Sequence, residues 1–480
     1  MVDDRVIALP LRRRNEYGVA PEFTEEGLAL AFAFAEKYCD RFRWVEEWNS
    51  WMEWTGAHWR KAKTLVAYDI IRALCRDAAA RVDLAARGGP RLAADLNTAK
   101  KRAAVQTMAR SDVRFQALGE QWDADDWLLG TPAGIIDLRT GDNIGMDSER
   151  YVTRITTVAP GGECQTWLEF LDVVTKGDER LQAYLQRLFG YCLTGSTREH
   201  SLTFIYGPGG NGKGTALAVL AGILGDLHRA ADVETFAERK HAAHSTELAR
   251  LHNARVVTSQ ETEKGQHWAE ARLKKLTGGD PITARFMRCD DFEFTPKFKL
   301  IIVGNHKPKF RSVDEAMRRR LHLIPFNHTV AKEDRDVNLG AKLKAEYSGI
   351  LAWAIRGCME WQQIGLDAPD SVLKATADYL DSEDMPGQWF KQRCKIDTHA
   401  KTSLKELFEN WRHWADLMRV APGDSRTLAA EVEKHLPFGS KRTVNGAARF
   451  VGVRLMSIDE IHAAIKEEET EEISPFSESR

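Results

Sequence analysis

The sequence lacks the cysteine patterns of disulfide-rich and zinc-binding proteins. Its seven cysteines are scattered over 480 residues, with no CxxC pair and no cysteine and histidine cluster at zinc-ligand spacing. Long apolar runs are also missing: none could cross a bilayer, and the basic start, residues 1–14, has no apolar core of signal-peptide length. We therefore expect reduced thiols in a cytoplasmic protein, with neither secretion nor membrane insertion.

An excess of charge of one sign is absent too. The 68 lysines and arginines are balanced by 70 aspartates and glutamates, so a surface that binds nucleic acid must be a local patch. No internal repeat is visible. The apolar fraction of 43% is ordinary for a globular protein, and a chain of this length can hold about two to four domains.

The first third of the chain shows the pattern of a mixed, mainly helical domain. We expect a flexible basic arm over residues 1–21 and the ordered domain over 22–160. The first helix is predicted from apolar residues at helical spacing, which are Leu28, Phe32, Ala35 and Cys39. Further helices are predicted at 66–86 and 91–110, and strands within 128–139.

Tryptophans crowd a short segment of this domain, around a hairpin turn predicted at Thr55-Gly56. Exposed indole rings could stack on single-stranded bases. A small core is the favoured interpretation, because tryptophan buries much apolar area and seldom stays exposed. The residues concerned are Trp44, Trp48, Trp51, Trp54 and Trp59.

Pro160-Gly161-Gly162 is typical of a linker and separates this domain from the rest of the chain. Downstream, apolar strand-like runs alternate with helical stretches, which predicts an α/β core with a parallel sheet and crossover helices. Near the C-terminus, helices followed by a hairpin that turns at Asn445-Gly446 predict a winged-helix-like module. The expected boundaries are 163–200 for a helical collar, 201–330 for the core, 331–385 for C-terminal helices, 386–456 for the winged-helix-like module and 457–480 for an acidic, disordered tail.

The strongest local signal is a glycine-rich loop between an apolar strand, Ser201 to Tyr206, and a helix-prone segment. A P-loop needs that order, because its glycines let backbone N–H groups surround phosphates; a plain glycine-rich turn is the alternative. Lys213 would neutralise the β and γ phosphates of ATP. Gly214 stands where serine or threonine usually binds Mg²⁺, so Thr215, the nearest hydroxyl, is assigned that role. The predicted ATP-binding residues are Gly207, Gly209, Gly210, Asn211, Gly212, Lys213, Gly214 and Thr215.

Polar residues at later strand ends are the candidate catalytic groups. Glu261 is placed to hold Mg²⁺ through water and to orient the attacking water, with Glu263 as second candidate. Asn305 ends another strand and could hold the water and the γ phosphate. ATPases that work as rings need an arginine that reaches the neighbouring subunit's γ phosphate. In the arginine run before the next strand, Arg320 is the first candidate for that role and Arg319 the second.

The order of these parts resembles the superfamily 3 helicases, and within them the primase-helicases of phages, plasmids and poxviruses. The resemblance implies an AAA-like P-loop ATPase core that assembles into homo-oligomeric rings, as hexamers, with ATP at the subunit interfaces and DNA in the central channel. Larger members carry a primase, but here the zinc-ribbon cysteines are missing, so we expect no primer synthesis and name a separate primase as a candidate partner. The matching segments are 122–141, 207–215, 255–263, 273–285, Asn305 and 318–326.

The same resemblance implies a hairpin that grips DNA, here from Thr283 to Phe294 with its turn near Cys289-Asp290-Asp291. The two aspartates depart from this expectation, because an acidic tip repels DNA. An ordinary surface hairpin is the alternative. The residues implied to lie near DNA phosphates are Lys274, Lys275, Arg285 and Arg288.

The predicted function is an ATP-dependent DNA helicase of phage or plasmid replication, which uses ATP and Mg²⁺ and acts as a ring on single-stranded or forked DNA. Two alternatives stay open. A replication initiator would use ATP only to assemble on DNA, without unwinding it, and a small-molecule kinase also has a P-loop, although it needs neither Asn305 nor the arginine run. Basic residues of the C-terminal module could hold duplex DNA, namely Lys441, Arg442, Arg449 and Arg454.

Overall fold

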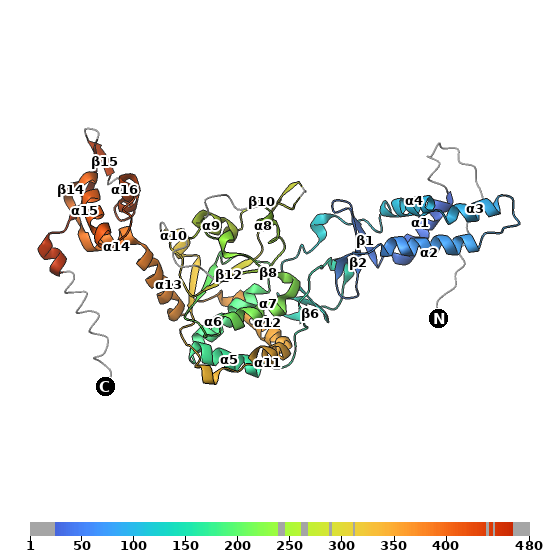
Figure 1. Ribbon diagram of the computed structural model, residues 1–480, viewed down its shortest axis with the longest axis horizontal. Helices are drawn as coiled ribbons and strands as arrows, with labels where there is room; N and C mark the ends of the chain where they lie inside the picture. The colour runs from blue at the N-terminus through green and yellow to red at the C-terminus, as the bar shows by residue number, and fades with distance from the viewer. Residues whose placement is uncertain are drawn as a thin grey trace.

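The parts of the molecule lie in a row. Figure 1 shows the N-terminal helices at one end, a central α/β core, and a C-terminal module at the other end. Helix α13 (Asp370–Glu383) leads from the core to that module. Among the described residues, we find no helix with the length and hydropathy that a membrane span needs. The computed structural model describes residues 25–238, 245–260, 267–287, 290–310, 313–437, 441–444 and 447–463.

The N-terminal part combines helices with small antiparallel sheets. The helices pack together at the far end, and the sheets lie between them and the core. The predicted strands within 128–139 are confirmed as a hairpin. The bounds are α1 (Glu25–Tyr38), β1 (Phe42–Val45), β2 (Ser50–Trp54), β3 (Trp59–Lys61), α2 (Val66–Ala80), α3 (Gly89–Leu96), α4 (Ala99–Arg110), β4 (Leu128–Thr131), β5 (Gly134–Asp137) and β6 (Asp142–Asn143), with short 3-10 turns at Gly119–Gln121 and Ser148–Arg150.

The tryptophan-rich segment forms the sheet of β1, β2 and β3, with the predicted turn at Thr55-Gly56 between β2 and β3. Its indole rings pack against one another and against Phe115. Trp48 and Trp54 are exceptions, because 39% of the surface of Trp48 is exposed and Trp54 is half-buried. The core interpretation is confirmed for the rings that are at most 7% exposed, which are Trp44, Trp51 and Trp59.

Helix α1 exists where it is predicted, but the residues at helical spacing do not all face the core, since only Ala35 of the four is buried. Leu28 and Phe32 are 49% and 54% exposed, whereas Leu30 and Phe34 are buried. The helix is apolar on more than one side, so both sets of residues recur at helical spacing. The choice between them is made by packing on β1, α2 and α4, which the local sequence does not contain.

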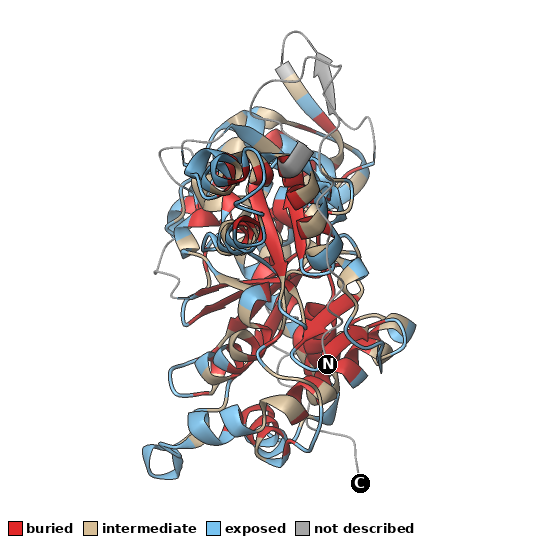
Figure 2. Cartoon of the chain, turned by 90° about the vertical axis from the view of Figure 1, so that its right-hand side faces the viewer, coloured by how far each residue is buried: buried red, intermediate tan, exposed pale blue. Residues whose placement is uncertain are grey.

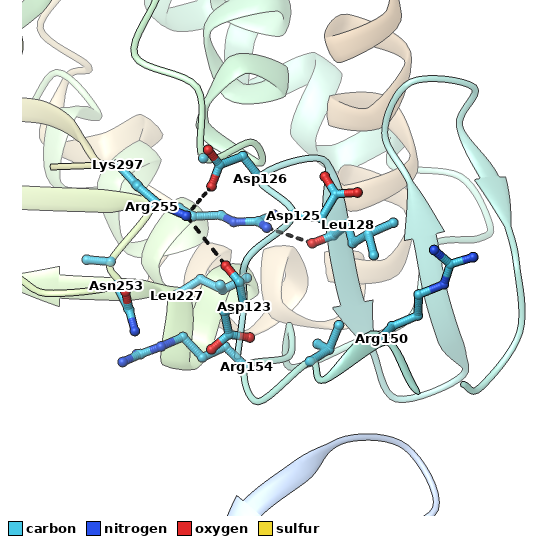
Figure 3. A pocket seen from close by; sticks show the side chains of 13 residues that line it. Asp123, Asp125, Asp126, Leu128, Arg150, Arg154, Leu227, Asn253, Arg255 and Lys297 are labelled. Carbon is cyan, nitrogen blue, oxygen red and sulfur yellow. Dashed lines mark hydrogen bonds and ion pairs between the residues drawn. The ribbon is translucent and has the colours of Figure 1, made fainter. Parts of the chain in front are cut away.

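The segment before β4 docks the N-terminal part onto the core, at the place that Figure 3 shows. Lys297 Nζ lies 2.7 Å from Asp126 Oδ1, and Arg255 Nη2 donates to the Leu128 carbonyl at 2.6 Å. Arg255 is buried and also donates to the carbonyl of Leu193. Arg255 directly precedes one strand of the central sheet and Lys297 lies two residues before another, so the N-terminal part is attached at the amino ends of those strands.

The central sheet is parallel, in the order β13-β7-β12-β9-β8. This confirms the predicted α/β core. Its strands are β7 (Leu202–Tyr206), β8 (His228–Ala230), β9 (Val256–Gln260), β12 (Lys299–Gly304) and β13 (Leu321–Pro325). The helices of the collar and core are α5 (Gln165–Thr175), α6 (Glu179–Cys192), α7 (Lys213–Leu224), α8 (Ser245–Ala249), α9 (Glu270–Gly278), α10 (Glu315–Arg318), α11 (Leu339–Ala345) and α12 (Tyr347–Ile364), with 3-10 turns at Gly225–Leu227, Val233–Thr235 and Lys332–Asp334.

Both faces of this sheet are covered, and its strands are drawn as buried in Figure 2. Successive residues of a strand point to opposite faces, so β12 contributes Ile301 to one hydrophobic cluster and Ile302 to another. The first cluster contains side chains of α5, α6, α7 and α12, and the second contains side chains of α9 and α13. Parallel sheets require such cover on both sides, which explains the long apolar runs of these strands.

The C-terminal module has its own hydrophobic core around Trp389, Trp411, Trp414 and Phe450. Its antiparallel sheet has the order β14-β16-β15, and helices precede and follow the first strand. The predicted turn at Asn445-Gly446 lies outside the described residues, between the last two strands. The bounds are α14 (Met385–Arg393), β14 (Cys394–Ser403), α15 (Leu404–Leu417), α16 (Ser425–Lys434), β15 (Lys441–Val444) and β16 (Ala447–Leu455).

Tyr184 of α6 and His322 of β13 form a buried polar pair between the collar and the edge of the sheet. The tyrosine hydroxyl lies 2.8 Å from His322 Nδ1. Burial lowers the pKa of His322 from 6.5 to about 4. The unfolded chain therefore binds more protons than the folded chain between these two values, and stability is lost as the pH falls from about 6.5 towards 4.

We expect a His322→Phe variant to lose less stability on acidification than the unaltered protein. The histidine alone should lower the free energy of unfolding by about 1.4 kcal/mol for each pH unit within that window. Thermal midpoints at pH 7 and pH 5 measure this difference. The Tyr184→Phe/His322→Phe double variant is the control, because it also removes the unpaired hydroxyl. Equal acid sensitivity of all three proteins would contradict the assignment.

Candidate active site

The glycine-rich loop joins the carboxyl end of β7 to the amino end of α7, as predicted. Gly212 caps α7 with φ +85°, and Gly210 has φ +76°, a left-handed backbone that suits glycine. A Cβ at Gly212 would come within 2.6 Å of Val174 and 2.9 Å of the Phe170 ring, both on α5. Glycine is therefore required both by the turn and by the close approach of the collar helix.

Lys213 points into its own loop. Its Nζ donates to the carbonyls of Gly207 and Pro208 at 2.7 and 2.9 Å and to Asn211 Oδ1 at 2.9 Å. Asn211 is itself fixed, because its Nδ2 donates to the Phe326 carbonyl that follows β13. Burial lowers the pKa of Lys213. A cation enclosed by carbonyl oxygens is suited to exchange these neutral partners for anionic ones.

The loop opens on a cavity of ≈ 350 Å³ at the carboxyl edge of the sheet. The register pairs Gly304 of β12 with Tyr206 of β7, and Val303 of β12 with Gln260 of β9, so these three strands end side by side. Asn305 follows β12 and lines the cavity, as predicted from its strand end. The other lining residues are Gly209, Gly210, Asn211, Gly212, Lys213, Gly214, Thr215, Gln260, Val303 and Gly304.

The acidic candidates follow Gln260, the last residue of β9. Glu261 and Glu263 lie outside the described residues, so their predicted roles stay predictions. Gln260 places the chain at the cavity at the point where it continues to Glu261. Within the described ranges, no group of three or more histidine, cysteine, aspartate or glutamate side chains could hold a metal ion. Thr215 lines the cavity and offers the hydroxyl for an ion that enters with a nucleotide.

The predicted arginine run lies at the amino end of β13. Leu321 of β13 pairs with Leu202, the first residue of β7, whereas the loop follows the last residue of β7. Arg318 forms an ion pair with Asp381 at 2.9 Å. Arg320 Nη1 donates to the Ala316 carbonyl at 2.9 Å, and its buried Nε has no hydrogen-bond partner in the part of the chain that the structure describes. Arg319 is exposed.

The predicted hairpin consists of β10 (Ile282–Arg285) and β11 (Asp291–Phe294) and projects from the core in Figure 1. Asp291 was predicted in the turn, but it is the first residue of β11 and pairs with Arg285, 3.7 Å from its Nε. The turn therefore begins at Phe286, which is 43% exposed. Arg288 lies outside the described residues.

The two lysines of α9 differ in their surroundings. Lys274 forms an ion pair with Asp314, which caps the amino end of α10. Lys275 is exposed. The charge of Lys274 is therefore partly neutralised within the chain, whereas Lys275 stays available to a partner.

Comparison with known proteins finds viral relatives that are named as putative helicases. Residues 31–176 match the family described as D5 N terminal like, and residues 205–320 match a family of unknown function. The chain is 26% identical to a putative helicase of Acanthamoeba polyphaga mimivirus over 61% of its length, and 25% identical to a putative helicase of Frog virus 3 over 56%. The chain thus has a region that resembles the D5 N-terminal family and is similar to viral proteins named as putative helicases.

The chain spans about a third of the length of the curated relatives it matches, since the alignments cover 33% and 30% of them. A solved apo structure of the NrS-1 C-terminal region is 11% identical, covers 90% of this chain and 100% of that chain, and has a TM-score of 0.48. Its A form is 12% identical over 62% of this chain and 78% of that chain, with a TM-score of 0.39.

Some residues at this site were not predicted. Gln260 directly precedes Glu261, so the strand-end argument could have included it. Phe170 and Val174 lie within the predicted helical collar, and no role at the loop was predicted for them, although α5 packs against the loop. Arg335 lies over Gly210, where an added Cβ would collide with its Nη2. Nothing in the local sequence indicates this contact, because Arg335 follows the loop by more than 100 residues.

Proposed function

We propose that the chain is an ATP-driven DNA helicase that works as a ring of identical subunits, a hexamer, on single-stranded or forked DNA. The observation that carries this proposal is the cavity at the carboxyl edge of the sheet, where Lys213, Thr215 and Asn305 meet the end of β9. Relatives named as viral putative helicases support the reaction class. A separate primase is the proposed partner for primer synthesis.

In the proposed reaction, the loop N–H groups and Lys213 bind the ATP phosphates, and Lys213 leaves its carbonyl partners to do so. Glu261 accepts a proton from the attacking water, and the amide of Asn305 orients that water against the γ phosphate. Mg²⁺ would be held by Thr215, with Glu261 through water, and would neutralise charge on the phosphates. These residues thus position the phosphates and the attacking water or stabilise the charge on the phosphates, as phosphoryl transfer requires.

A neighbouring subunit supplies the remaining cation in this proposal. The arginine run cannot serve its own loop, because the length of β13, five residues at about 3.3 Å each, separates the two. Arg319 replaces Arg320 as the first candidate. Its side chain is exposed, whereas Arg320 is held at the Ala316 carbonyl. ATP would therefore be hydrolysed between two copies of the chain.

DNA contacts are proposed on two elements. The β10–β11 hairpin would track one strand, with Arg285 and Lys275 near its phosphates. In the C-terminal module, the order of helix, strand, two helices and hairpin supports a winged helix that holds the duplex. Arg449 is exposed there, but Arg454 is paired with Glu460 at 2.6 Å and is the weaker candidate.

Unwinding of a forked duplex in the presence of ATP and Mg²⁺ tests the proposal, with the mass of the assembly measured in parallel. Strand separation that requires ATP is expected. DNA binding and ATP-dependent assembly without strand separation would favour a replication initiator over a helicase. ATP turnover that single-stranded DNA does not stimulate would favour a small-molecule kinase instead.

A further inference from the structure

A second cavity adjoins the loop on the side of the collar. Its volume is ≈ 790 Å³, and it shares Gly210, Gly212, Gly214 and Thr215 with the first cavity. Most of its wall is apolar. The walls come from Phe170, Val173 and Val174 of α5, Ala218 and Val219 of α7, and Leu339, Leu343 and Tyr347 of α11 and α12.

The walls of this cavity are fixed to one another. Glu346, directly before α12, accepts hydrogen bonds from the backbone N–H groups of Thr166 and Trp167 at 3.0 Å each. The first turn of α5 is thereby tied to the start of α12. These hydrogen bonds hold α5 against the start of α12, which favours a largely pre-formed site on the collar side.

Arg335 closes the boundary between the two cavities. The segment after β13 returns over the loop, where the Val330 N–H donates to the Gly210 carbonyl at 3.0 Å. Arg335 Nε donates to the Val330 carbonyl at 3.0 Å, and its Nη2 lies over Gly210. The guanidinium therefore faces the loop that would hold phosphates, from within the same chain.

Other charged groups also line this cavity. Asp336 is held by Lys342, with Nζ and Oδ2 2.7 Å apart, and this hydrogen bond lowers the pKa of Asp336. Glu169 and Asp334 also line the cavity. Carboxylates accept the hydrogen bonds that ribose hydroxyls donate, so these two suit a sugar between the apolar wall and the loop.

We propose that this second cavity binds the base and sugar of the nucleotide and that Arg335 is a second phosphate-binding cation, in addition to Lys213. This rests on the proposed ATP site. The ligand is a nucleoside triphosphate, with its base between α5 and α11 and its phosphates between Arg335 and the loop. Nucleotide binding would then connect the collar to the segment after β13.

Calorimetric titration of the full chain with ATP and with inorganic tripolyphosphate tests both the nucleoside site and the phosphate role of Arg335. Arg335→Ala should weaken binding of both ligands about tenfold, because it removes a charge-assisted hydrogen bond. Ala218→Trp places a ring in the cavity and should weaken ATP binding at least about tenfold. It should leave tripolyphosphate binding unchanged, which also shows that the variant folds. Lys332→Ala, exposed in the same segment, is the matched control.

The outcomes separate this inference from the proposed function. If Arg335→Ala binds both ligands as Lys332→Ala does, Arg335 has no phosphate role. If Ala218→Trp binds ATP as tightly as the unaltered chain, the cavity does not hold the nucleoside. If the unaltered chain binds neither ligand, or if Lys213→Ala binds both normally, the proposed ATP site itself is wrong.

Discussion

Lys213→Ala is expected to reduce ATP turnover by at least about 100-fold, the loss seen when one preorganised stabilising group is removed from an active site. Lys213 is the cation enclosed by the loop, held by the Gly207 and Pro208 carbonyls and by Asn211. Without it, the carbonyls would face the phosphates uncompensated. Phosphate release at saturating ATP and single-stranded DNA is the measurement.

The control for this variant is Lys374→Ala, which removes an exposed lysine from α13. Its turnover should match that of the unaltered chain. Circular dichroism should show intact helices in both variants, because Lys213 is held by loop carbonyls and lies at the start of α7 without packing into a hydrophobic cluster. A Lys213→Ala protein with full turnover would show that ATP is hydrolysed elsewhere or not by this chemistry.

The order of strand, loop and helix could be predicted because it depends on residues that are close together in the sequence. Glycines, the lysine and the flanking apolar runs lie within about two dozen residues, and each constrains its own backbone. Asn305 was found for a related reason. The carboxyl ends of parallel strands meet at one edge of a sheet, so a polar residue at a strand end is placed by topology alone.

Contacts between distant segments could not be predicted in this way. Arg335 reaches Gly210 because the chain after β13 returns over the loop, and no periodicity marks such a return. The half-buried position of Arg320 and the exposure of Arg319 depend on α10 and its neighbours, since adjacent residues in a charge run look equivalent in the sequence. The sequence predicts Asp291 in an acidic hairpin tip, whereas the strand register places it opposite Arg285.

These differences share one cause. Local sequence fixes which backbone forms, but the partner of a side chain is fixed by the tertiary fold. Gly212 illustrates both the local and the tertiary effect. Its φ of +85° is required by the local turn, whereas the Phe170 and Val174 side chains that exclude a Cβ come from the collar. A nucleotide site between the collar and the loop is therefore visible only once α5 is placed.

Arg319→Ala is expected to reduce ATP turnover about 1000-fold or more, as loss of an arginine supplied by a neighbour does. Arg320→Ala should lower turnover less. The decisive measurement mixes subunits: Lys213→Ala and Arg319→Ala proteins are each inactive, but a mixture regains turnover if ATP is held between copies. Random assembly gives intact pairs at roughly a quarter of the interfaces, because each site needs one residue from each neighbour.

The mixing result also decides between a shared site and a site within one chain. Arg319 lies at the amino end of β13 and Lys213 beyond the carboxyl end of β7, so in one subunit the two variants damage opposite edges of the same sheet. If the mixture stays as inactive as its components although the two proteins co-assemble, each subunit completes its own site. In that case the second cation must come from the same chain, and Arg335, which already faces the loop, becomes the residue whose loss should abolish turnover.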